Sequence, residues 1–176
     1  MQNIFLKTER LILRYITQND FEALKSILQD KEVMYAWEYE FTDMDVQAWI
    51  DKNLQMYAKH NFGYFLLSEK VSNTVIGQAA LMPDIIEGTQ YHEIGYILKK
   101  EFWHKGYARE AASALKEYAF HVLQLKEVIF EIRPQNLPSL KVAESLHAKV
   151  CGEFIKNVRG IKMPHLIYTL SKLMKS

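Results

Sequence analysis

The fold of this chain is decided by residues 91–123, which read YHEIGYILKKEFWHKGYAREAASALKEYAFHVL. Residues 91–99 have the aromatic and β-branched composition of a strand, and residues 107–123 repeat small and apolar side chains at helical spacing. The loop between them contains Gly106, whose missing Cβ suits a tight turn. A strand, a loop and a helix in this order predict the first part of a βαβ unit.

The sequence after this stretch completes the unit and adds a hairpin. Residues 128–133 place Val128, Phe130 and Ile132 on one face and predict a strand. A helix is expected over residues 137–147, with Asn136 as its N-cap. Two last strands, at residues 149–156 and 162–170, are expected to form a terminal hairpin.

The sequence before it predicts three further strands and two helices. The strands are expected at residues 10–16, 64–68 and 75–82, the helices at 20–29 and 44–60, and an irregular aromatic segment at 31–41. Pro83 and Gly88 are expected to mark a turn. Antiparallel strands that precede a central βαβ unit predict an α+β (mixed α/β) fold around one twisted, mostly antiparallel sheet.

Composition restricts the class of protein. The chain has 176 residues, 49% hydrophobic and 24% charged, with no repeat or Gly/Ser linker, so we expect one domain over residues 1–176. A net charge of +1 and the lack of a basic stripe argue against a nucleic-acid partner. The single Cys151 excludes an intrachain disulfide and is expected to be a small buried residue. The absence of a signal sequence and of a long apolar run predicts a cytoplasmic protein without membrane partners.

The loop before residue 107 carries the candidate chemistry. A helix N-terminus presents unpaired backbone N–H groups and a partial positive charge, which together bind phosphate. Gly106 and Ala108 leave room for an anion, and Lys105 adds a cation. These residues alone are compatible with a phosphate ligand of any kind or with an ordinary glycine turn. The G-x-x-x-x-G-K-[ST] and G-x-G-x-x-G patterns are both missing, which excludes the two common nucleotide loops.

Four stretches in order resemble a known family. They are residues 8–14 (TERLILR), 93–98 (EIGYIL), 102–111 (FWHKGYAREA) and 136–139 (NLPS). Together they resemble the RimJ/RimL-like branch of the GNAT N-acetyltransferase superfamily, over nearly the whole chain. The resemblance implies a GNAT-like α/β/α sandwich and an acetyl-CoA-dependent N-acetyltransferase.

The same resemblance implies where acetyl-CoA binds. The backbone of Ile97, Leu98 and Lys99 would pair with the pantetheine arm, and a backbone N–H near Leu98 would polarise the thioester carbonyl. The pyrophosphate would lie on the loop and first helical turn, at His104, Lys105, Gly106, Tyr107, Ala108 and Arg109. Asn136 would contact the cofactor arm, although an N-cap role alone would also explain it.

The implied reaction is direct attack of a primary amine on the thioester, without a covalent enzyme intermediate. The amine must first lose a proton, and the candidate base is Glu93, with Glu131 as a weaker second; either carboxylate could instead be an ordinary strand residue. Ser139 would donate a hydrogen bond to the departing sulfur, or would only satisfy the first turn of its helix.

The acceptor amine would be a protein N-terminus, a polyamine or another small amine. Aromatic and acidic side chains in the irregular segment suit a cation, and the candidates are Trp37, Tyr39 and Glu40. The alternative is plain packing of the helix pair over the sheet, which is favoured for Trp37. The histidines show no metal-ligand spacing, so no metal is expected. The family includes monomers and homodimers.

Two positions depart from the family pattern. His104 stands where glycine is frequent, and Ala143 stands where many relatives have a tyrosine that protonates the leaving thiolate. The missing tyrosine keeps a second hypothesis open, namely a non-catalytic module that binds acyl-CoA as a sensor or for assembly.

Overall fold

The computed structural model describes residues 3–172. Its strands are β1 (Ile4–Lys7), β2 (Leu11–Tyr15), β3 (Tyr64–Glu69), β4 (Val75–Ile86), β5 (Thr89–Leu98), β6 (Glu127–Ile132), β7 (Lys149–Val158) and β8 (Ile161–Ser171). Its helices are α1 (Phe21–Leu28), α2 (Asp43–His60), α3 (Tyr107–His121) and α4 (Leu137–Ser145). Within the described range, none of these helices is both long enough and apolar enough to cross a membrane.

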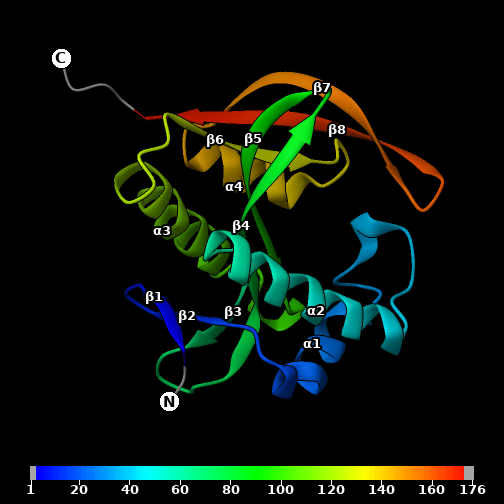
Figure 1. Cartoon of the computed structure of the whole chain (residues 1–176), viewed down its shortest axis with the longest axis vertical. Helices are drawn as coiled ribbons and strands as arrows, with labels where there is room; N and C mark the ends of the chain where they lie inside the picture. Colours follow the sequence, from blue (N-terminus) through cyan, green and yellow to red (C-terminus); the bar gives the residue numbers. More distant parts are fainter. Residues whose placement is uncertain (1–2, 173–176) are drawn as a thin grey trace. The chain divides into compact units, whose positions relative to one another are not determined.

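The strands form one sheet in the order β1-β2-β3-β4-β5-β6-β8-β7 (Figure 1). Strands β5 and β6 run parallel, with Glu93 opposite Ile129, and α3 connects them along the chain. The pairs β1–β2, β2–β3, β3–β4, β6–β8 and β7–β8 are antiparallel. The mixed fold with a single parallel βαβ unit is therefore confirmed.

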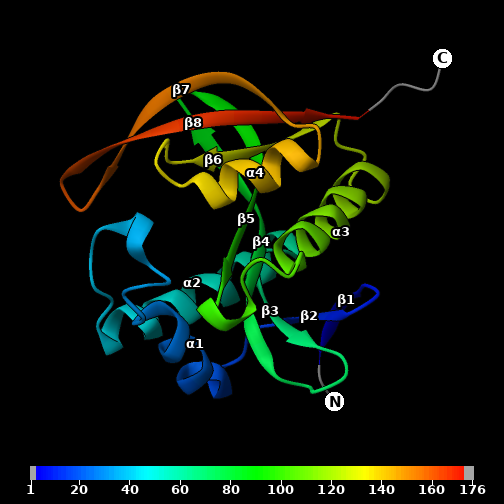
Figure 2. The same cartoon turned by 180° about the vertical axis from the view of Figure 1, so that it is seen from behind.

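The chain divides into two compact units, which are described separately. The first unit comprises Met1–Ala80 and Tyr96–Ala111. In it, α1 and α2 pack against each other (Figure 2). Its core is built from fully buried aliphatic and aromatic side chains of the strands and both helices: Leu11, Leu13, Leu24, Ile27, Val46, Ile50, Phe65 and Leu67.

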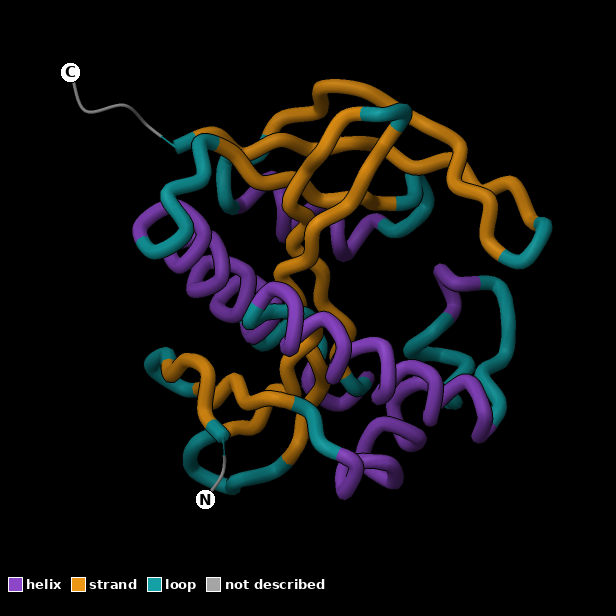
Figure 3. The backbone as a smooth tube through the Cα atoms, in the orientation of Figure 1, coloured by secondary structure: helices purple, strands orange, loops and turns teal. Residues whose placement is uncertain are grey.

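The second unit comprises Leu81–Gly95 and Ala112–Ser176. It contains the long β7–β8 hairpin, traced in Figure 3, and the helix α4, which contacts β6. One face of its sheet carries an apolar cluster, formed by Ile86, Tyr91, Ile129, Phe154 and Ile167. Since side chains alternate along a strand, a residue two positions before or after one of these apolar residues lies on the same face of the sheet.

The structure differs from the sequence expectations at one missed strand and one misplaced turn residue. Strand β1 was not predicted, because four residues next to the N-terminus carry too weak a pattern. Pro83 was expected to mark a turn but lies inside β4, since its fixed φ is compatible with an extended backbone. The turn expected at Gly88 is present, at Glu87 and Gly88, whose φ values of 49° and 85° are left-handed.

Candidate active site

The loop between β5 and α3 has the backbone of a tight turn. His104 and Gly106 have φ values of 60° and 80°, in the left-handed region that favours glycine. The first intrahelical bond runs from Glu110 N–H to Gly106 C=O at 3.0 Å, so the amides that precede Glu110 come before the helical ladder begins. These amides and the helix dipole make the turn suitable for an anion.

A charged cluster, formed by residues between β1 and β2 and by Glu110 of α3, supports this loop. The Glu110 carboxylate accepts hydrogen bonds from Thr8 Oγ1 at 2.5 Å, Arg10 N at 2.8 Å and Arg10 Nε at 2.7 Å. Arg10 Nη1 also donates to the carbonyl of Lys105 at 3.0 Å, and Nη2 would lie 3.4 Å from a Cβ built on Gly106. We call Thr8, Arg10 and Glu110 the loop brace. Burial would raise the pKa of Glu110, but the hydrogen bonds from Thr8 and Arg10 outweigh it and lower that pKa.

Some backbone groups at the end of β5 already have hydrogen-bond partners within the chain. Lys99 N–H donates to the carbonyl of Ile76 on β4 at 2.9 Å, and the indole N–H of Trp103 donates to the carbonyl of Leu98 at 2.8 Å. Gly77 allows this approach of the strands, because a Cβ there would lie only 2.3 Å from the carbonyl oxygen of Ile97. Consecutive residues of a strand point their N–H groups to opposite sides, so the Leu98 N–H points away from β4.

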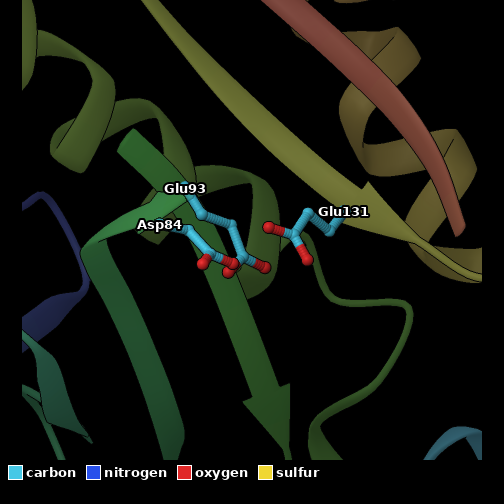
Figure 4. A group of neighbouring side chains, drawn as sticks. All are labelled: Asp84, Glu93 and Glu131. Atoms are coloured by element: carbon cyan, nitrogen blue, oxygen red, sulfur yellow. The ribbon is translucent and has the colours of Figure 1, made fainter. Parts of the chain in front are cut away.

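The candidate base Glu93 lies in a cluster of carboxylates in the second unit. One carboxylate oxygen each from Asp84, Glu93 and Glu131 lies within 4.8 Å of the others (Figure 4). Lys156 Nζ lies 2.6 Å from Glu131 Oε2 and 3.5 Å from Asp84 Oδ2. We call these four residues the acidic cluster. They share the sheet face of the apolar cluster, each two positions along its strand from an apolar member.

The pKa values in the acidic cluster diverge. Burial, the charge of Glu93 and a hydrogen bond with Asp84 together raise the pKa of Glu131 to about 8, against the opposing effect of Lys156. Burial would also raise the pKa of Asp84, but its hydrogen bonds and the Lys156 charge lower it overall. The pKa of Lys156 is raised, because the neighbouring carboxylates outweigh its burial. Titratable groups whose pKa values are pushed apart are typical of sites that move protons.

The helix α4 begins with the predicted Asn-x-x-Ser element. Asn136 Oδ1 accepts a hydrogen bond from Ser139 N at 3.3 Å, so Asn136 is the N-cap that was expected. Ala143 is fully buried in the same helix. A small apolar side chain there packs in the core and has no proton to give.

The irregular segment is organised around aromatic rings. Trp37 packs edge-on against Tyr39, Phe41 and Trp49, with centroids 6.3, 6.2 and 5.9 Å away. Tyr39 and Glu40 line a cavity of about 230 Å³. Glu40 Oε1 also lies 2.6 Å from Lys31 Nζ, in an exposed ion pair.

Sequence reasoning missed the loop brace and the members Asp84 and Lys156 of the acidic cluster. The strand period identified which residues share a face, but strand pairing was needed to bring them together. Cys151 was expected to be buried and is exposed, with Sγ 2.8 Å from Thr169 Oγ1, because β7 turns that residue outward.

Comparison with known proteins places the chain in a family. Residues 10–149 match the model of the acetyltransferase (GNAT) domain family. The uncharacterized N-acetyltransferase YnaD of Bacillus subtilis is 32% identical over 152 residues, which are 86% of each chain.

Two solved structures share the fold at low identity. The ribosomal L7/L12 alpha-N-protein acetyltransferase RimL superposes with a TM-score of 0.79 and 16% identity, over 98% of this chain and 96% of that one. The spermidine N-acetyltransferase from Vibrio cholerae, solved with CoA and spermine, superposes with a TM-score of 0.73 and 16% identity, over 92% of this chain and 95% of that one. The family match, the relative and the βαβ geometry agree, and the chain belongs to the GNAT acetyltransferase family.

Proposed function

We propose that this protein transfers the acetyl group of acetyl-CoA to a protonated primary amine, such as a polyamine or a protein N-terminal amine. The observation that carries the proposal is the turn at residues 103–106 on the N-terminus of α3, in the connection from β5, in a chain of the GNAT family. The two low-identity neighbours act, by their names, on different amines, so the acceptor is inferred from this chain's own residues.

The cofactor side of the proposal uses the first unit. The amides of residues 104–109 would hold the pyrophosphate, since Gly106 offers no Cβ to keep an anion away. The Leu98 N–H, which points away from β4, would polarise the thioester carbonyl. Because Lys99 N–H and the Leu98 carbonyl have partners within the chain and the Ile97 carbonyl lies close to Gly77 of β4, the Leu98 N–H is the backbone group here that the pantetheine arm or its thioester would meet.

The chemical step needs a proton acceptor. An ammonium has no lone pair, so its proton would first pass to the Glu93 carboxylate, directly or through water. The amine nitrogen would then form a bond to the carbonyl carbon while the carbon–sulfur bond breaks. The amide nitrogen loses its extra proton, and the thiolate gains one to leave as the CoA thiol. Ser139 is the candidate that assists the sulfur, and Asn136 the candidate that contacts the arm.

The irregular segment of the first unit supplies further candidate residues for binding a cationic acceptor. Tyr39 and Glu40 line its cavity, and an aromatic ring beside a carboxylate suits an organic cation. Trp37 would act mainly by holding this segment through its ring contacts.

The test is a free-thiol release assay with acetyl-CoA and a panel of amines that includes spermidine, alkylamines and peptides with free N-termini. We expect thiol release that depends on at least one amine. The second candidate function, a non-catalytic acyl-CoA-binding module, is favoured by the buried Ala143 at the position of the usual acid. This second function predicts that CoA binds tightly and that no thiol is released with any acceptor. That result would refute acetyl transfer.

A further inference from the structure

The acidic cluster has an imbalance of charge that its own lysine does not correct. Three carboxylates lie close together and one lysine, Lys156, pairs with two of them, so the fully ionised group would carry a net negative charge. Figure 4 shows the Glu131 carboxyl directed at those of Glu93 and Asp84. The side chain of Glu131 is only 1% exposed, so water does not screen this repulsion.

One oxygen of Glu131 lacks a donor. Lys156 contacts Oε2, whereas the buried Oε1 receives no hydrogen bond. A buried carboxylate oxygen without a donor is costly, and a proton on it removes the cost by allowing a hydrogen bond to Asp84. The proton therefore stands where a cationic hydrogen-bond donor could bind.

Part of the acidic cluster is exposed to solvent. The side chains of Asp84 and Lys156 are 33% and 39% exposed, so the cluster can be reached from solvent at these two residues, whereas the side chain of Glu131 is buried. Lys156 already shows that an ammonium fits against two of these carboxylates. His165 lies near Lys156, and burial lowers its pKa first and the Lys156 and Arg133 charges lower it further, so it adds no cation near neutral pH.

We propose that Asp84, Glu93 and Glu131 bind the ammonium group of the acceptor and that this ammonium displaces the proton held on Glu131. The inference rests on the proposed function and names its substrate class, a cationic aliphatic amine. Polyamines and protein N-termini share this ammonium chemistry. Binding delivers the ammonium next to Glu93, the proposed base, and restores the charge balance that the proton provides in the free protein.

The test is titration calorimetry of the wild-type protein near pH 7, with CoA present, using spermidine and a hexapeptide that begins with a free alanine. Measurements in phosphate and Tris buffers give the number of protons released. We expect at least one probe to bind with release of close to one proton, since Glu131 is mostly protonated below its pKa. Probes that bind without proton release would overturn the proposal, as would Mg²⁺ binding in a protein that binds neither amine.

Three variants make the test specific. Glu131→Gln should abolish the proton release and raise Kd by about tenfold or more, because a neutral amide gives no charge-assisted bond. Asp84→Asn, at a more exposed position, should also raise Kd. This variant replaces Glu131→Gln in the test if Glu131→Gln does not fold. Glu127→Gln makes the same charge change at an exposed site of β6 and should leave binding unchanged. Equal affinity and proton release in the wild type and Glu131→Gln would contradict the proposal.

The same measurements distinguish a failure of the proposed function from a failure of the ammonium site. Amine binding with proton release but no thiol release would support the ammonium site and refute transfer. Thiol release on neutral and cationic amines alike, with Asp84→Asn unchanged, would support transfer and refute the ammonium site.

Discussion

Glu110 and Glu131 are two glutamates whose surroundings push their pKa values in opposite directions. Glu110 accepts three hydrogen bonds from Thr8 and Arg10, and its pKa is lowered. Glu131 has one ammonium partner and faces two other carboxylates, and its pKa is raised to about 8. A carboxylate with all its donors present stabilises a loop, whereas one with an oxygen left over can exchange protons and bind a cation.

The largest expected effect comes from removing the proposed base in the acidic cluster. Glu93→Gln keeps the size of the side chain but cannot accept a proton, so kcat should fall by about 100-fold or more. The measurement is thiol release near neutral pH, with Glu127→Gln as the control of equal charge change. Full activity of Glu93→Gln would remove Glu93 from the mechanism.

The pH dependence of stability separates the two glutamates next. Since the pKa of Glu131 rises from 4.5 to about 8 on folding, the free energy of unfolding should fall as pH rises through this window, by up to about 1.4 kcal/mol per pH unit. Urea unfolding at several pH values should show this slope in the wild type and lose it in Glu131→Gln. Parallel curves for the two proteins would show that Glu131 ionises normally.

A third test concerns the loop that the brace supports. Gly106→Val should weaken CoA binding by at least about tenfold, because a branched side chain meets both the pyrophosphate and a φ of 80°. Gly160→Val is the matched control, since Gly160 has a φ of 82° and nothing within 4 Å of a built Cβ. CoA affinity lost equally in both variants would mean that backbone strain, and not the phosphate, explains the effect.

The brace itself should contribute to stability. Glu110→Gln leaves Arg10 with weaker partners and should lower the free energy of unfolding by about 1–3 kcal/mol. Glu32→Gln breaks the exposed Lys100 ion pair and should cost less than about 1 kcal/mol. Denaturant unfolding compares the two, and a cost for Glu110→Gln no greater than that for Glu32→Gln would show that the brace is ordinary surface charge.

The smallest effect is expected at His104. Its φ of 60° strains any side chain with a Cβ, so His104→Gly should be neutral or stabilise the protein by about 1 kcal/mol. Thermal unfolding measures this, and a clear loss of stability would show that the imidazole makes a contact that holds the loop.

The sequence was sufficient for the fold because its strong signals are local. The strand at residues 91–99, the helix from Tyr107 and the Asn136 cap follow from period, glycine and capping rules, and all three are present. The two charged clusters were not predictable in the same way. Glu110 meets Thr8 across 102 residues, and Lys156 meets Asp84 across 72, so both contacts depend on how distant elements pack together.

Steady-state kinetics of Glu93→Gln and Glu110→Gln, measured against both substrates, test most directly whether the two clusters have different roles. The acidic cluster is proposed to act in the chemical step, and the brace to position the cofactor loop. We predict that Glu93→Gln lowers kcat with little change in KM for acetyl-CoA, and that Glu110→Gln raises KM for acetyl-CoA with kcat largely retained. The reverse pattern, or equal changes of both constants in both variants, would contradict this account.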